Sequence, residues 1–177
     1  IDSMDVYSRG EASTAVMMPS GQSISVGIIG KMGTLGLNDG SFTPVSNLLK
    51  FTGEDSVVIM QIALQAGPDE NVIVDSLKFD LTKGTDSYIN NVELIRDNNN
   101  DGTIDGGDLS IGLNAMSGGF VEFLGGSLDT ITQSTTKNYL LVVNLSATIL
   151  TPADTLQFAI DSMDVYSRGE ASTAVMM

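Results

Sequence analysis

The sequence predicts an all-β protein folded as an antiparallel β-sandwich, on the strength of three observations. Apolar and polar residues alternate with a period of two in many stretches of the 177-residue chain, as they do in strands buried on one face. Clusters of Gly, Asn, Asp and Ser, such as "AGPDEN" and "TKGTDS", separate these stretches at the short intervals typical of tight turns. No long amphipathic helix is visible, so many short strands are the expected elements.

The alternation identifies individual strands in chain order. Strands are expected over Ile24–Ile29, Met32–Leu37, "SVVIMQIALQA", "DSLKFDLT", Ile89–Ile95, Phe120–Leu124, "KNYLLVVNLSAT" and "DTLQFAIDSMDVYS". In the four quoted stretches one face is apolar, and the residues on that face are Val58, Met60, Ile62 and Leu64; Leu77, Phe79 and Leu81; Tyr139, Leu141, Val143 and Leu145; and Leu156, Phe158 and Ile160. Opposite the third of these faces lie Leu140, Val142 and Asn144. The residues between Asp108 and Met116 are compatible with a helical turn.

The composition limits the classes of partner. Acidic residues outnumber basic ones by 22 to 8, for a formal net charge of −14, which argues against nucleic acids and anionic membrane surfaces as partners. No apolar run approaches the length of a membrane span, so no membrane insertion is expected. The chain begins at Ile1 rather than at a methionine, which indicates processing or a fragment of a longer protein.

The residue types also argue against an enzyme. The chain contains neither His nor Cys, so the familiar nucleophile and base pairs cannot be assembled. A glycosidase needs only two carboxylates, but Trp is absent and aromatic residues make up only 6%, which leaves no aromatic platform for a sugar. The triplet at Asn144 matches a glycosylation acceptor, and its position within a predicted strand favours coincidence.

One segment occurs twice. The eighteen letters "IDSMDVYSRGEASTAVMM" stand at Ile1–Met18 and again at Ile160–Met177. They predict a strand that continues the one at Leu156, then a turn at "RGE" and a second strand at "ASTAVMM". The copy is either an engineered graft or one period of a tandem array plus the start of the next. The period would be 159 residues, the offset from Ile1 to Ile160.

The junctions favour the tandem array, because no linker interrupts them and the alternation continues across Ile160. The chain is then organised as a linking strand segment at residues 1–18, a sandwich at 19–159 and a terminal strand segment at 160–177. A repeat that passes a strand to its neighbour fills an open sheet edge there. The alternative, in which each copy folds within its own domain as a bead on a string, stays open.

The stretch "RDNNNDGTIDGGD" predicts a calcium site. Its spacing matches the pattern D-x-[DN]-x-[DN]-G of a twelve-residue calcium loop, with Gly102 at position six and an acid at position twelve. Ca²⁺ takes six to eight oxygen ligands, and alternate side chains of a tight loop can all turn inward. The expected ligands are Asp97, Asn99, Asp101, the carbonyl of Thr103, Asp105 and Asp108.

The alternative to a calcium site is a polar turn between strands, since Asn, Asp and Gly are common turn residues. The number of matched positions favours calcium. "NNVELI" before the loop is typical of a strand, whereas a calcium sensor has a helix there. We therefore expect a structural calcium clip between strands.

These stretches resemble a known family. "NNVELIRDNNNDGTIDGGDLSIG", "GGFVEFLG", "TTKNYLLVVNLSAT" and "PADTLQFAI" are similar to a repeat domain of large bacterial and archaeal surface proteins. The resemblance covers roughly Leu48 to Phe158, whereas Pro19–Asn47 match nothing in that family. It implies an immunoglobulin-like sandwich with a dockerin-like calcium loop after a strand that ends here in Ile95-Arg96-Asp97.

The resemblance and the duplication together suggest an extracellular function. The resemblance implies a structural or adhesive module at the cell surface, where millimolar calcium supports weak sites. With the duplication, it suggests a repeat of an extracellular filament whose partners are identical subunits or adjacent repeats. The alternative is a calcium-dependent adhesin that binds glycans or a receptor.

Overall fold

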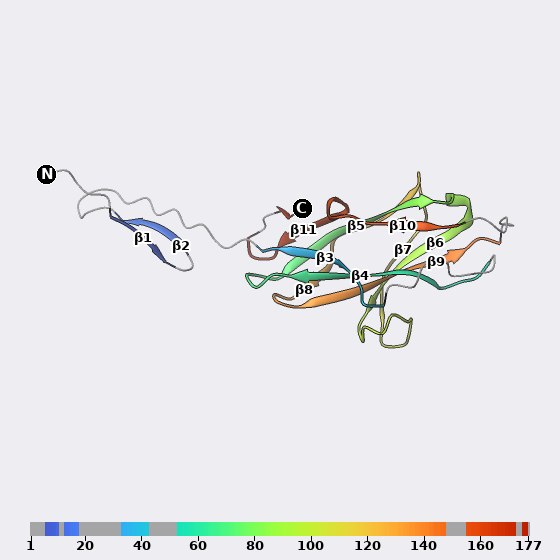
Figure 1. Ribbon diagram of the computed structural model, residues 1–177, viewed down its shortest axis with the longest axis horizontal. Helices are drawn as coiled ribbons and strands as arrows, with labels where there is room; N and C mark the ends of the chain where they lie inside the picture. Colours follow the sequence, from blue (N-terminus) through green and yellow to red (C-terminus); the bar gives the residue numbers. More distant parts are fainter. Residues whose placement is uncertain are drawn as a thin grey trace. The chain divides into compact units, whose positions relative to one another are not determined.

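The computed structural model of this chain describes residues 6–10, 13–17, 33–42, 53–147, 155–172 and 175–176 (Figure 1). The chain forms two compact units, Ile1–Met32 and Gly33–Met177. In the described residues the helical elements are two short 3-10 turns, so the all-β prediction is confirmed. The strand expected at Ile24–Ile29 lies outside the described residues.

The larger unit is a sandwich of two antiparallel sheets, as the sequence predicts. The strands of the first sheet follow the order β3 (Leu35–Asp39), β4 (Val57–Ala66), β9 (Thr136–Leu145), β6 (Ile89–Asp97) and β7 (Leu109–Asn114). The second sheet is centred on β5 and comprises β8 (Phe120–Ile131), β5 (Val72–Lys83), β10 (Gln157–Ala159), β11 (Val165–Gly169) and β12 (Val175–Met176).

Strands β10 and β11 lie end to end along one edge of β5, while β8 pairs with its other edge (Figure 1). The sequence predicts one continuous strand here, and that prediction is wrong. A 3-10 turn, η2 (Ser162–Asp164), separates the two strands. Asp161 caps this turn by accepting a hydrogen bond from the Met163 N–H, and Asp164 caps it in return, so the local capping box breaks the strand.

The core lies between the two sheets and contains nearly all of the predicted apolar faces. Val58 is the exception, because an irregularity in the pairing between Val58 and Met60 reverses the alternation there. Val58 instead packs on the outer face of the first sheet with Leu140 and Val142. The predicted residues that do lie in the core are Met60, Ile62, Leu64, Leu77, Phe79, Leu81, Tyr139, Leu141, Val143, Leu145, Leu156, Phe158 and Ile160.

Two further elements differ from the prediction. The sequence is compatible with a helical turn between Asp108 and Met116, but the structure has the strand β7 there, which pairs with β6. The strand expected at Phe120–Leu124 continues to Ile131. Gly125 and Gly126 interrupt its alternation, and Gly126 has a φ of 66°, a value that favours glycine. The pairing with β5 holds the strand on both sides of these residues, where Leu124 lies opposite Ser76 and Asp129 lies opposite Val74.

One carboxylate joins the two sheets. Asp129 of β8 accepts hydrogen bonds from Lys137 Nζ at 2.8 Å, Tyr139 Oη at 2.9 Å and Arg96 Nη1 at 3.2 Å, all of which belong to the opposite sheet. Burial alone raises the pKa of a carboxyl, but the hydrogen bonds from Lys137 and Tyr139 outweigh it and hold the pKa of Asp129 below its usual value. Burial and the Asp129 charge raise the pKa of Tyr139.

The smaller unit contains a hairpin of β1 (Val6–Gly10) and β2 (Ser13–Met17). These residues belong to the first copy of the duplicated segment, and β11 and β12 belong to the second. Each copy forms two antiparallel strands, as predicted, but in the second copy β11 includes Arg168 and Gly169 of the predicted turn, and Ala171 and Ser172 of the predicted strand form a turn instead. The registers of the two copies also differ. Ser8 pairs with Ala15 in the first copy, whereas its counterpart Ser167 pairs with Met176 in the second.

Candidate functional site

The predicted calcium loop joins two neighbouring strands of the first sheet. Asp97 is the last residue of β6, and Asp108 immediately precedes β7. Arg96 and Leu109 are cross-strand partners, so the pairing of β6 with β7 brings the two ends of the loop together. The loop protrudes from the sandwich in Figure 1. The six predicted ligands therefore belong to one compact turn.

Asp97 anchors the loop from inside the protein. The residue is only 3% exposed, and its carboxylate accepts hydrogen bonds from the Gly102 N–H at 2.9 Å and the Asp101 N–H at 3.3 Å. Gly102 has a φ of 74°, and a Cβ there would collide with Phe42. Both the backbone conformation and the space at position six therefore require glycine.

The middle of the loop groups an amide with two carboxylates. Asn99 Nδ2 donates to Asp101 Oδ2 and to Asp105 Oδ2, each at 2.9 Å. Thr103 donates to Asp101 Oδ1 from its hydroxyl and from its N–H, and the hydroxyl bond is the main cause that lowers the pKa of Asp101. Rotating the Asn99 amide about its last side-chain bond would direct its oxygen towards the same two carboxylates.

Asp108 closes the loop on its exposed side. Its Oδ1 accepts from the Asn98 N–H at 3.0 Å and its Oδ2 from the Asp105 N–H at 3.1 Å. All the predicted ligand atoms are oxygens, which fits a hard cation such as Ca²⁺. Within the described residues, no three acidic side chains converge as they do at a metal site. Calcium binding by this loop stays a prediction.

Gln61 is a residue of this site that the sequence analysis missed. It lies on β4, is 1% exposed, and donates from Nε2 to Asp97 Oδ2 at 2.7 Å and to Asn100 Oδ1 at 3.1 Å. Its Oε1 accepts from the Phe42 N–H at 2.8 Å. Gln61 thus ties the loop to β4 and to the segment after β3. A lone glutamine in an alternating strand is typical of a solvent-facing position, so the pattern carried no signal for this role.

A second cluster holds the C-terminal copy of the duplicated segment. Glu70, which is 7% exposed, lies just before β5. Its Oε2 accepts from the N–H groups of Ala171 at 2.8 Å and Ser172 at 2.9 Å, and its Oε1 accepts from the Gly33 N–H at 2.8 Å. The Ser172 hydroxyl also donates to this carboxylate and is the largest cause that lowers the pKa of Glu70 to about 2.

Side chains of β11 fasten it to the second sheet. Val165 and Ser167 are buried. Arg168 Nη2 donates to the carbonyl of Gly126 at 2.8 Å, and its Nε lies 3.3 Å from Asp75 Oδ2 of β5. A Cβ on Gly169 would collide with Glu70 and Ser172, so the turn after β11 fits closely against the Glu70 carboxylate.

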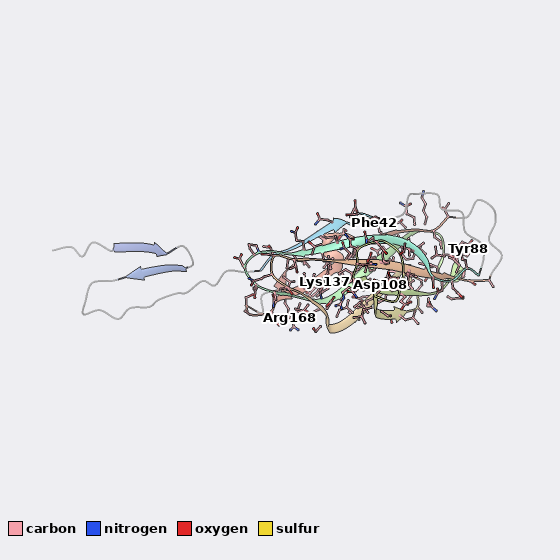
Figure 2. All side chains as sticks on the ribbon, turned by 90° about the horizontal axis from the view of Figure 1, so that it is seen from below. Phe42, Tyr88, Asp108, Lys137 and Arg168 are labelled. Carbon is pink, nitrogen blue, oxygen red and sulfur yellow. The ribbon has the colours of Figure 1, made fainter. Side chains whose placement is uncertain are left out.

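The calcium loop and the terminal strand occupy different parts of the sandwich. Figure 2 shows Arg168 and Tyr88 towards opposite ends of its long axis, with Asp108 between them. None of the hydrogen bonds described above joins a residue of one cluster to a residue of the other. A change in one can therefore be tested without directly altering the other.

Asn144 is engaged within the first sheet. Its Oδ1 accepts from the Ser56 N–H and its Nδ2 donates to Asn91 Oδ1, both at 2.6 Å. Both polar ends of the amide thus have partners inside the fold. This arrangement fits the coincidental reading of the glycosylation triplet.

Comparison with models of known protein families and with curated proteins found no match. The likeness to surface-protein repeat domains therefore remains an expectation from the sequence. No helix in the described ranges has the length and apolar character needed to cross a membrane.

Proposed function

We propose that this chain is a structural repeat of an extracellular filament or cell-surface appendage, made of immunoglobulin-like sandwiches. The repeats are joined head to tail by β-strand complementation and stiffened by bound calcium. The observation that carries the proposal is the duplicated segment. One copy completes the second sheet beside β5, and the same eighteen residues stand at the opposite end of the chain.

The contacts of β11 support a linking role for this segment. A strand at a sheet edge supplies backbone hydrogen bonds that any chain carrying the same segment can also form. The Ser172 hydroxyl, which donates to Glu70, and the Arg168 guanidinium, which donates to Gly126, add side-chain contacts that depend on the sequence of the segment. A repeat that offers this edge therefore recognises a particular strand rather than an arbitrary one.

The loop geometry supports a stiffening role for calcium. The loop is fixed at both ends by the pairing of β6 with β7, and Gln61 links it to β4. A cation held by its carboxylates would offset the repulsion between them and restrain the loop. The high net negative charge of the chain would favour such cations near the surface.

The test is electron microscopy and small-angle X-ray scattering of a chain that contains three periods of 159 residues, with and without a calcium chelator. We expect extended rods of regular spacing in calcium and a shorter, more flexible particle in chelator. A matched chain with Asp97→Asn and Asp101→Asn in every repeat should behave in calcium as the unaltered chain does in chelator. Three independent globules joined by flexible linkers in both conditions would contradict the proposal.

A further inference from the structure

The place where β11 docks is a defined site, here called the β5 edge site. It consists of the backbone edge of β5 from Val72 to Leu77 together with the carboxylate of Glu70. In the structure, the copy at Ile160–Met177 fills it. The edge of β5 pairs with the backbone of β11 from Val165 to Gly169. The Glu70 carboxylate accepts hydrogen bonds from the N–H groups of Ala171 and Ser172, which follow β11.

We propose that the N-terminal copy, Ile1–Met18, is a second occupant of the β5 edge site and replaces Ile160–Met177 there within the same chain. This inference rests on the proposed function, because it states which strand complements which sandwich. In a tandem array, every copy at a junction would complete either the repeat that precedes it or the repeat that follows it.

The two copies are chemically identical. Each residue of the C-terminal copy that contacts the site has an identical counterpart 159 positions earlier. Arg9 is the counterpart of Arg168, which pairs with Asp75 and Gly126, and Gly10 is the counterpart of Gly169. The remaining counterpart pairs are Val6 and Val165, Tyr7 and Tyr166, Ser8 and Ser167, Ala12 and Ala171, and Ser13 and Ser172.

The number of residues between the N-terminal copy and Gly33 is sufficient for this exchange. The N–H of Gly33 donates to Glu70, so the larger unit begins beside the β5 edge site. If Ser13 took the place of Ser172 on the Glu70 carboxylate, both Ser13 and Gly33 would lie at that carboxylate. The residues between them would then only have to form a closed loop. Those residues could extend over roughly 60 Å, at about 3.3 Å per residue. Loops of this length give millimolar effective concentrations, which favour the same chain over a second molecule in micromolar solution.

The strand registers of the two copies differ by an even number of residues. In the hairpin of the smaller unit the segment pairs Gly10 with Ser13. In the β5 edge site the innermost pair of the counterpart segment is instead Arg168 with Val175. The carboxylate of Glu70 accepts hydrogen bonds from the N–H groups of Ala171 and Ser172, which lie between these paired residues. The register changes by two residues, which keeps every side chain on its original face of the strand, so the site can accept the hairpin after a local slip.

The two copies can be altered independently, and this makes the exchange testable in the full-length chain. Gly169→Val places a Cβ against Glu70 and so prevents the C-terminal copy from fitting the β5 edge site, while the N-terminal copy is unchanged. Gly10→Val is the matched control, and the double variant spoils both copies. Valine is chosen because it favours strands.

We expect Gly169→Val to remain monomeric by light scattering and to melt within about 2 °C of the unaltered chain, because the N-terminal copy takes over the site. The double variant should melt roughly 5–10 °C lower, which is the size of shift expected from overpacking without a substitute strand. If Gly169→Val melts as low as the double variant, no replacement occurs and the inference is wrong. If Gly169→Val forms dimers, the occupant comes from a second molecule and the same-chain inference is wrong.

Disulfide trapping reports the exchange even if valine is tolerated at residue 169. The chain has no native cysteine, and Tyr166 lies opposite Ser76 across the β5 edge. In the Gly169→Val background, Tyr7→Cys and Ser76→Cys should form an intramolecular disulfide, seen by mass spectrometry of a non-reduced digest. Tyr166→Cys with Ser76→Cys in the unaltered background is the positive control, and adding Gly10→Val should abolish the bond from Tyr7→Cys. Absence of the Tyr7→Cys bond, where the positive control forms, refutes the exchange.

A negative result would leave the proposed function standing on its own test. Three-period chains could still form stiff rods if each copy completed only the sandwich that precedes it in the chain, as Ile160–Met177 does here. Conversely, exchange in the single chain together with flexible three-period particles would refute the filament function but not the exchange.

Discussion

The backbone N–H of Ser172 donates to Glu70 Oε2 at 2.9 Å, between residues separated by 102 positions in the chain. This bond joins the end of the C-terminal copy to the residue that precedes β5. The N–H of Gly33 donates to the same carboxylate. The Glu70 side chain therefore binds both the first described residue of the larger unit and the turn that follows β11.

Replacing Glu70 by Gln should loosen the terminal strand without unfolding the sandwich. An amide oxygen accepts hydrogen bonds more weakly than a carboxylate does, and charged bonds are roughly twice as strong as neutral ones. Hydrogen–deuterium exchange should become at least about tenfold faster at the N–H groups of residues 165–172, with β4 and β9 unchanged. Asp55→Asn, at an exposed position, is the control. Equal exchange in the two variants at residues 165–172 would contradict this role.

Stability should fall in acid over a defined range of pH. Hydrogen bonds lower the pKa of Glu70 to about 2 and also lower the pKa of Asp129. A carboxyl whose pKa is depressed by folding stabilises the protein above its unfolded pKa, about 4, and loses that contribution as the pH falls through the folded pKa. The melting temperature should therefore be nearly constant above pH 5 and fall steadily from about pH 4 towards pH 2.

The pH dependence can be assigned with two variants. Glu70→Gln and Asp129→Asn should each flatten the acid branch of the curve, because the titrating carboxyl is gone. Asp129→Asn should also lower the plateau at neutral pH, since the positive charges of Lys137 and Arg96 lose their shared partner. An acid branch of unchanged steepness in both variants would show that other carboxyls govern it.

Calcium should raise the melting temperature. A ligand at 100 times its Kd stabilises the folded state by about 2.7 kcal/mol, which corresponds to roughly 5–11 °C for a domain of this size. Asp97→Asn and Asp101→Asn should abolish the calcium-dependent shift, whereas Asp55→Asn should retain it. Calorimetry in calcium and in excess chelator measures the shift, and identical melts in the two conditions would exclude the calcium clip.

Gln61→Leu should destabilise the loop that contains the predicted calcium ligands. The substitution removes a buried donor at 2.7 Å from Asp97 and the acceptor of the Phe42 N–H. Leaving such groups without partners costs about 1–3 kcal/mol each. Gln65→Leu, on the same strand at an exposed position, is the matched control and should change the free energy of unfolding by less than about 0.5 kcal/mol. Chemical denaturation of both variants separates the two cases.

The apolar pattern predicted the sandwich because burial of alternating side chains is a local signal with a period of two. Leu77 and Phe79, or Leu141 and Val143, lie in the core where the alternation places them. The pattern failed where a tertiary contact overrides it. Val58 faces outward because the pairing with β9 is irregular there, and the strand after Leu156 breaks at a capped turn.

The candidate sites divide in the same way. The sequence by itself determined that six oxygen-bearing residues from Asp97 to Asp108 share one turn, since all of them belong to a single short loop whose spacing is visible in the letters. It also established that the two ends of the chain carry the same segment. Only the tertiary structure decided that Gln61 holds the loop and that Glu70 holds the terminal strand. Their partners lie 36 and 102 residues away, and only the packing of the strands brings such distant polar groups within hydrogen-bonding distance.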